Sequence, residues 1–312
     1  RRYDARGTFT NLVGKRGGGP GEYQHPGGMA VTRDGLLIVF DPENSRITYF
    51  HPDGKVQRDF PVVRPGFFGD NFVIDTLGLI YQTVSVGGPL TEGYGSRQQY
   101  VRLSPDGVVR DSVHLPERYM PVRVANTFSL ATSDGMRWNF TERRLVAPYL
   151  PGGVLSGTSH AYRFVVAPVG RPVLVVERSH TPLPLGDAER ADWQKWVEYF
   201  KTRPGPPPAY EVPRLKPAIR ALRSDHLGRV WVDVFVAAER RNDPPRPAGD
   251  ARPQLTWKER TTYDVFSPAG AYLGRVAFPA ETELLAIRDH RLYTRSKGPD
   301  GEDRVVVYRL AQ

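Results

Sequence analysis

The chain has 312 residues, 39% of them hydrophobic and 25% charged, which excludes an intrinsically disordered protein and allows one large domain or two ordinary ones. It contains no cysteine, and this excludes disulfides, thiolate metal sites and a nucleophilic thiol. The formal net charge is +9, but the basic residues are scattered along the chain, so they do not form the contiguous patch that favours nucleic-acid binding.

The first predicted element is a single strand at residues 7–14. It comes before the first repeat of the chain and has no sheet of its own. We expect it to complete the last sheet, which begins near residue 282. Closure of that kind would remove both exposed sheet edges.

A glycine-rich stretch, GGGPGEYQHP, follows at residues 17–26. A phosphate-binding loop places its glycines after a strand, opens a helix and is followed by Lys-Ser or Lys-Thr. This stretch contains Pro20, lacks that pair and leads into another strand. We therefore interpret it as a connector into the first sheet.

Two classes of turn alternate along the chain. One class ends in glycine just before a strand-like run, at 34–35, 77–78, 134–135 and 227–228, and the other has the form x-Pro-x-Gly, at 51–54, 104–107, 167–170 and 267–270. Gly35 and Gly78 are 43 residues apart, the spacing expected for a four-stranded propeller blade. The pattern predicts an all-β fold, a six-bladed β-propeller of four-stranded antiparallel blades in a single domain spanning 1–312. The predicted blades lie near 28–62, 70–115, 122–142, 143–180, 219–278 and 282–310.

The segment GGGPGEYQHPGGMAVTRDGLLIVFDPENSRITYF resembles an NHL-type blade. That family's pattern runs G-x-G-P-G-x-F, P-x-G-[IM]-A-V, D-G, a hydrophobic strand and D-x-x-N-x-R-I. The match covers residues 14–50, with Tyr23 where Phe is usual, and later blades keep only the turn and strand patterns. The resemblance implies a six-bladed propeller like those of largely uncharacterised, often exported bacterial proteins.

Asp41 and Asn44 have two interpretations. They could begin a calcium loop, but the glycine and the terminal glutamate of such a loop are missing. In an NHL-type blade they fall at the second turn. We therefore expect them to cap that turn.

The first insertion, 181–218, contains the one predicted helix, near 187–201. Asp187 can cap the helix, and Trp193, Trp196, Val197 and Phe200 recur at helical spacing. This aromatic stripe either packs on the scaffold or anchors a partner, since tryptophan is frequent in binding hot spots.

The second insertion, 237–260, carries arginines together with acidic residues. It is either a solvated loop or an arm that becomes ordered on a partner. Both insertions, and the loop 85–98, join strands at the end opposite the tight turns, where we expect the working face of the scaffold. The predicted partner-binding residues are Trp193, Trp196, Phe200, Arg240, Arg241, Arg246, Arg252 and Trp257.

Known catalytic patterns do not occur in the chain. The seven histidines never show a metal-ligand spacing, and the serines near residue 156 lie outside any G-x-S-x-G motif. The sequence therefore predicts no catalytic residue, no metal ligand and no cofactor.

These features favour a non-catalytic interaction module, an exported accessory or scaffold subunit in the bacterial periplasm or outside the cell. It would dock through its long loops onto a larger complex, including a membrane complex. Relatives of the fold include enzymes, so one alternative is a calcium-dependent propeller hydrolase, lactonase or lyase with its site in the central channel. A second alternative is a nucleic-acid-binding propeller.

Overall fold

A computed structural model describes residues 1–4, 6–62, 72–86, 97–114, 140, 144–202, 211–243, 246–298 and 300–310. They belong to two compact units, which are described separately. Unit 1 is Arg1–Leu90, Gly95–Glu117 and Leu150–Gly152; unit 2 is Thr91–Tyr94, Arg118–Tyr149 and Gly153–Gln312. A single domain spanning 1–312 stays a prediction.

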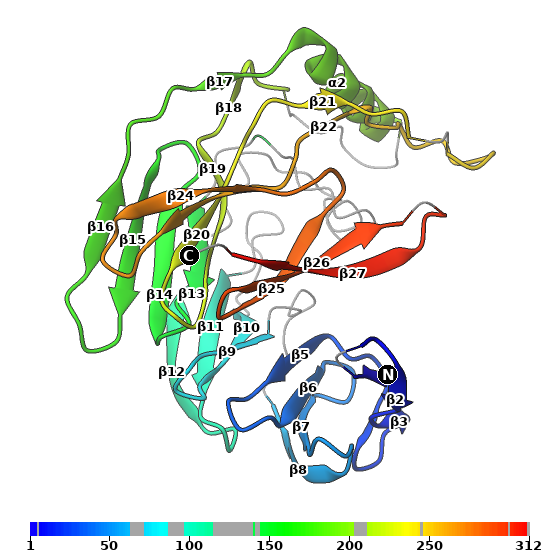
Figure 1. Cartoon of the computed structure of the whole chain (residues 1–312), viewed down its shortest axis with the longest axis vertical. Helices are drawn as coiled ribbons and strands as arrows, with labels where there is room; N and C mark the ends of the chain where they lie inside the picture. Colours follow the sequence, from blue (N-terminus) through cyan, green and yellow to red (C-terminus); the bar gives the residue numbers. More distant parts are fainter. Residues whose placement is uncertain are drawn as a thin grey trace. The chain divides into compact units, whose positions relative to one another are not determined.

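Unit 1 contains two four-stranded antiparallel sheets whose strands follow one another along the chain (Figure 1). Their facing sides share a core in which Ile38, Phe40, Ile47 and Ile80 are fully buried. The strands are β5 (Gly28–Val31), β6 (Leu37–Asp41), β7 (Arg46–Phe50) and β8 (Val56–Pro61), then β9 (Phe72–Ile74), β10 (Ile80–Val86), β11 (Arg97–Leu103) and β12 (Val109–His114).

Unit 2 contains two more four-stranded antiparallel sheets and one three-stranded sheet. The strands are β13 (Arg144–Pro148), β14 (Gly153–Thr158), β15 (Arg163–Pro168) and β16 (Leu174–Glu177); β19 (Ile219–Ser224), β20 (Val230–Val234), β23 (Thr262–Phe266) and β24 (Tyr272–Ala277); and β25 (Glu283–Arg288), β26 (Arg291–Lys297) and β27 (Asp303–Arg309). Leu155 and Phe164 pack with Val232 between the first and second of these sheets, and Trp231 packs with Leu284 between the second and third. Successive sheets thus share apolar layers, as propeller blades do.

Short elements lie outside these sheets. The first insertion holds α2 (Asp187–Lys201) between the paired strands β17 (Leu183–Pro184) and β18 (Leu215–Lys216), and the second holds β21 (Glu239–Arg240) paired with β22 (Trp257–Lys258). In unit 1, β1 (Arg2–Tyr3) pairs with β2 (Phe9–Asn11), and β3 (Lys15–Arg16) with β4 (Glu22–Tyr23). None of the described helical residues forms a segment long and apolar enough to cross a membrane.

A repeated aspartate turn joins the first and second strands of one sheet in each unit. The Asp75 carboxylate accepts hydrogen bonds from the N–H groups two and four residues on and from the hydroxyl of Tyr81. The Asp225 carboxylate does the same, with the indole N–H of Trp231 in place of the hydroxyl. Gly78 and Gly228 have φ of 82° and 81°, which glycine adopts without strain. The turn Asp-x-Leu-Gly thus sets where the next buried strand begins.

The prediction of six blades is wrong. The described residues form five sheets of the blade type, which match the predicted boundaries 28–62, 70–115, 143–180, 219–278 and 282–310 to within a few residues. The predicted third blade, 122–142, lies outside the described residues except for Phe140. One Asp-Gly pair indicates a turn there, but the segment is about half as long as the repeat that four strands and their turns require.

The N-terminal strand was expected to close the last sheet. In the structure Phe9–Asn11 pairs with Arg2–Tyr3 within unit 1, and the last sheet of unit 2 has three described strands. Closure of that sheet by residues 7–14 stays a prediction.

Candidate functional site

The two insertions of unit 2 are bonded directly to each other. Asp192, on α2, has a side chain that is only 4% exposed. Its Oδ2 accepts hydrogen bonds from the backbone N–H of Thr256 (2.7 Å), from the Thr256 hydroxyl (2.6 Å) and from the N–H of Trp257 (3.2 Å). The helix of the first insertion therefore holds β22 of the second.

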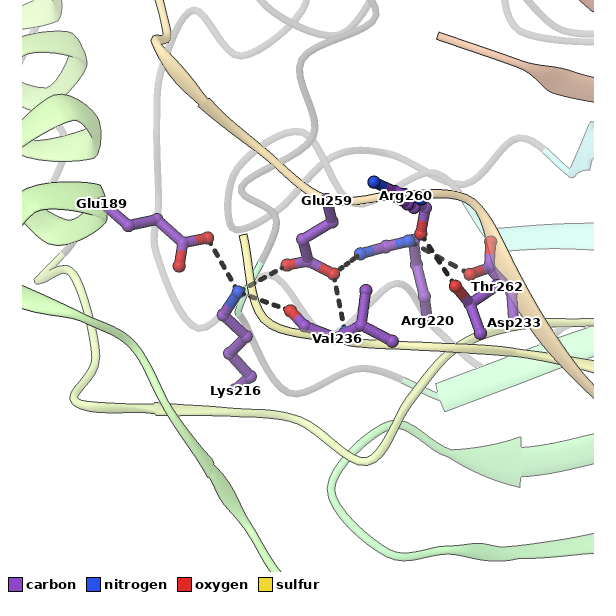
Figure 2. A network of polar contacts seen from close by, with 8 residues as sticks. All are labelled: Glu189, Lys216, Arg220, Asp233, Val236, Glu259, Arg260 and Thr262. Atoms are coloured by element: carbon purple, nitrogen blue, oxygen red, sulfur yellow. Dashed lines mark hydrogen bonds and ion pairs between the residues drawn. The ribbon is translucent and has the colours of Figure 1, made fainter. Parts of the chain in front are cut away.

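A buried lysine makes a second connection between the insertions (Figure 2). The side chain of Lys216 is fully buried, and its ammonium donates to Glu189 Oε1 (2.8 Å), Glu259 Oε1 (2.9 Å) and the carbonyl oxygen of Val236 (2.8 Å). All three donors of the ammonium are thereby used. We call the bonded set of Glu189, Asp192, Lys216, Glu259 and their partners the insertion joint.

The joint continues into the sheet through Arg220, on β19. Arg220 Nη2 donates to Glu259 Oε2 at 2.5 Å, and Nη1 to Asp233 Oδ1, on β20, at 3.1 Å. The Val236 N–H also donates to Glu259 Oε2, at 3.0 Å. Both oxygens of Glu259 are therefore engaged, and this carboxylate ties the end of β22 to β19 and to the residues just after β20.

Burial and pairing shift the pKa values within the joint. Burial raises the pKa of Glu189 above its ordinary value, and the neighbouring Lys216 only partly offsets this. Burial alone would lower the pKa of Arg220, but Asp233 and Glu259 outweigh it and raise the pKa. Lys216 and Arg220 are the cations that face Glu189, Glu259 and Asp233, so losing either cation would leave buried negative charge without compensation.

The aromatic stripe of the helix faces inward. Trp193 is 5% exposed and packs with Leu185, Val212 and Phe235. Trp196 is fully buried, with the Tyr199 ring 5.5 Å away edge-on and the Arg246 guanidinium 5.9 Å from its ring centre. The burial of these two indoles supports the interpretation that the stripe packs on the scaffold.

The burial of Trp193 and Trp196 means that neither indole is exposed to a partner in this structure, and their role in partner binding stays a prediction. Phe200 lies in α2, but its side chain is outside the described part of the chain. Trp257 is half-buried, and the side chains of Arg241, Arg246 and Arg252 are 20%, 32% and 38% exposed. Arg240 is exposed on β21, with no described side-chain partner.

The arginines of the second insertion are largely paired within it. Asp250 accepts from Arg246 at 3.1 Å and from Arg252 at 2.8 Å, and these hydrogen bonds, led by the one from Arg252, hold the pKa of Asp250 far below its usual range. Glu239 pairs with Arg260 at 2.9 Å. Arg240 is therefore the predicted contact residue best placed to meet a partner.

The residues that form the joint were not predicted from the sequence. A signal for two of them was present, because Glu189 and Asp192 fall on the same face of α2 as Trp193 and Trp196. Acidic residues on an apolar helix face indicate buried partners. The identity of those partners, 27 to 65 residues away, has no sequence signal.

Asp41 and Asn44 cap their turn, as expected. Asp41 is 2% exposed and accepts hydrogen bonds from the N–H of Gln24 (2.7 Å) and Glu43 (3.0 Å) and from the Asn44 side chain (2.8 Å). Within the described ranges, no group of three or more His, Asp or Glu side chains is arranged to hold a metal ion.

Removing the Asp192 carboxylate should loosen the helix from β22. In Asp192→Ala the Thr256 and Trp257 amides lose their acceptor, and the expected loss of stability is about 1–3 kcal/mol. Hydrogen exchange of these two amides should accelerate at neutral pH, whereas Lys195→Ala, which removes only the exposed partner of Asp192, should leave them protected.

The same contact should depend on pH in the wild-type protein. Burial opposes ionisation of Asp192, but hydrogen bonds from Lys195 and Thr256 outweigh it and lower the pKa of this carboxyl. The stabilisation is therefore present above about pH 4 and is lost as the pH falls further. Unchanged exchange in Asp192→Ala would contradict the assignment.

No family model and no curated protein sequence matches the chain. Its structure is similar to that of a DUF4221 family member from Bacteroides vulgatus (10% identity, TM-score 0.43, covering 96% of this chain and 82% of that one). It is also similar to a streptogramin B lyase (12% identity, TM-score 0.36, covering 92% of this chain and 83% of that one). A putative gluconolactonase is a third similar structure (15% identity, TM-score 0.35, covering 91% of this chain and 76% of that one). These neighbours are β-propeller proteins, but TM-scores this low carry no conclusion about function. In its described residues the chain is all-β with one helix and is built from blade-type sheets; its membership of the NHL-type family stays a prediction.

Proposed function

We propose that the chain is a non-catalytic interaction module, an exported accessory subunit of NHL type that works in the periplasm or outside the cell. It docks onto a larger protein complex, including a membrane complex, through the outer side of the joined insertions. The observation that carries the proposal is the insertion joint. Two segments that interrupt the blade pattern are held together by buried charges, and this supports a rigid surface rather than a pair of independent loops.

The exposed residues of the second insertion suggest the chemistry of the partner. Arg240 stands exposed on β21, and the chain as a whole has a net charge of +9. Complementary charge accelerates association and selects among partners. The partner surface we propose is therefore a protein face that presents carboxylates.

Arg240→Glu tests this proposal. Purified wild type and variant would be added to a gently prepared extract of the native source, sedimented on a gradient, and the co-sedimenting proteins identified by mass spectrometry. Wild type should travel with a larger assembly, and Arg240→Glu should lower the bound fraction at least about fivefold, with an unchanged melting temperature. The matched control is Arg171→Glu, an exposed arginine just after the turn at 167–170, which should bind like wild type.

Two outcomes would contradict the proposal. One is that wild type sediments alone, at the 35.0 kDa of the free chain. The other is that both charge reversals weaken association equally, since this would indicate attraction by net charge without a defined surface.

The alternatives make different predictions in the same material. A calcium-dependent hydrolase, lactonase or lyase would show a melting temperature that rises with calcium, because a ligand that binds only the folded state stabilises it. A nucleic-acid-binding propeller would bind RNA or DNA with an affinity that falls steeply as salt increases.

A further inference from the structure

A small polar cavity of about 290 Å³ lies beside the insertion joint in unit 2. It lies between the β21–β22 hairpin and the turn that leads into β25. Its lining residues are Arg241, Lys258, Glu259, Thr261, Glu281, Thr282 and Glu283. Volumes near 300 Å³ are at the small end of ligand sites, so the cavity suits a molecule of a few heavy atoms.

Arg241 has a donor that the described protein does not satisfy. Its Nε is buried and has no hydrogen-bond partner among the described residues. Its Nη2 lies 3.7 Å from Glu239 Oε2, which is too long for a hydrogen bond. A buried guanidinium N–H without an acceptor is costly, and a carboxylate is the acceptor that matches its geometry best.

Two carboxylates on the cavity wall have acceptor capacity left. Glu281 accepts one described bond, from Lys258 at 3.2 Å, and Glu283 accepts one from Arg295 at 2.6 Å. An ionised carboxylate can accept about four hydrogen bonds. The third acid of the wall, Glu259, is already fully engaged in the insertion joint and so holds the wall in place.

The charges of the wall restrict the ligand. Two cations and three carboxylates give a net negative lining, which disfavours a simple anion. A simple cation would leave the Arg241 Nε without an acceptor. A ligand that carries both a carboxylate and an ammonium group matches both features.

The backbone at Glu281 supports a binding role. This residue has φ of 53°, in the left-handed region that residues with side chains seldom adopt. Strained conformations are concentrated at binding and catalytic sites, where the surrounding structure maintains them. Here the strained residue lines the same cavity as the unsatisfied arginine.

We propose that this cavity binds a small zwitterion of the α-amino acid class. The ligand's carboxylate accepts from Arg241, and its ammonium donates to Glu281 and Glu283. This inference goes beyond the docking function and does not depend on it, since the cavity is lined by unit 2 alone.

Isothermal titration calorimetry with the full chain tests the proposal. The probes are the protein amino acids, with glycine and L-serine first, and with acetate and methylammonium as ligands that carry only one of the two charges. At least one amino acid should bind saturably, and neither single-charge probe should bind. Arg241→Gln should weaken that binding about tenfold or more, whereas Arg240→Gln, the neighbouring exposed arginine, should bind like wild type.

Glu281→Gly separates ligand binding from folding. Glycine adopts a φ of 53° freely, so the variant should melt at or above the wild-type temperature and yet lose amino acid binding. The proposal is overturned if no amino acid binds, if acetate or methylammonium alone binds equally well, or if Arg241→Gln and Glu281→Gly both bind like wild type.

Discussion

Replacing Lys216 by methionine is expected to lower the free energy of unfolding by about 3–5 kcal/mol, since it removes the cation that Glu189 and Glu259 share and leaves buried carboxylates without a partner. Urea denaturation at pH 7 measures the loss. The deficit should shrink in acid. Burial already raises the pKa of Glu189. In the variant, Glu189 is therefore protonated in the folded state at a pH where it is still ionised in the unfolded chain. The folded state consequently gains stability relative to the unfolded chain as the pH falls.

The matched control for this variant is Lys201→Met. Lys201 is also paired with a glutamate, Glu198, at 2.8 Å, but the two side chains are 46% and 57% exposed. An exposed pair of this kind contributes well under about 1 kcal/mol, so the control should unfold almost like wild type. Equal losses in Lys216→Met and Lys201→Met would show that the joint does not stabilise the fold.

Trp196→Ala is expected to cost about 3–5 kcal/mol, because a fully buried indole leaves a large cavity when it is truncated. The Trp196 ring lies between the helix and Arg246 of the second insertion, so the variant should also loosen that insertion. Thermal or urea unfolding measures the first effect, and hydrogen exchange of residues 246–258 measures the second.

The same variant discriminates between the two interpretations of the aromatic stripe. If Trp196 packs on the scaffold, stability and partner association fall together in Trp196→Ala, while Arg240→Glu loses association only. If Trp196 were a direct contact with the partner, Trp196→Ala would keep its stability and lose association. That second result would show that Trp196 contacts the partner directly.

The positions of the blades were largely predictable because their turns carry local information. Proline presets φ and glycine accepts a positive φ, so turns such as 51–54 and 267–270 are encoded within four residues. The helix was predictable for a similar reason, since the spacing of Trp193, Trp196 and Val197 lies within two helical turns. The predicted blade count is wrong because a single Asp-Gly pair encodes one turn and not the four strands of a blade.

The insertion joint could not be predicted because its partners are far apart in the sequence. Lys216 binds Glu189, 27 residues before it, and Glu259, 43 residues after it. Local patterns do not identify which charges are buried together, and most charged residues of a surface loop remain solvated. The sequence therefore predicts Arg240 and its neighbouring arginines as functional residues, and no local pattern indicates that Lys216 is buried and paired.

The buried charges of the joint lead to an expectation about the order in which the chain folds. Burying one member of the set before its partners would desolvate a charge without compensation, so we expect the set to close only after both insertions have docked. Interactions that form after the folding transition state slow unfolding and leave the folding rate nearly unchanged. We therefore expect Lys216 and its two glutamates to slow unfolding and so to lengthen the lifetime of the native state.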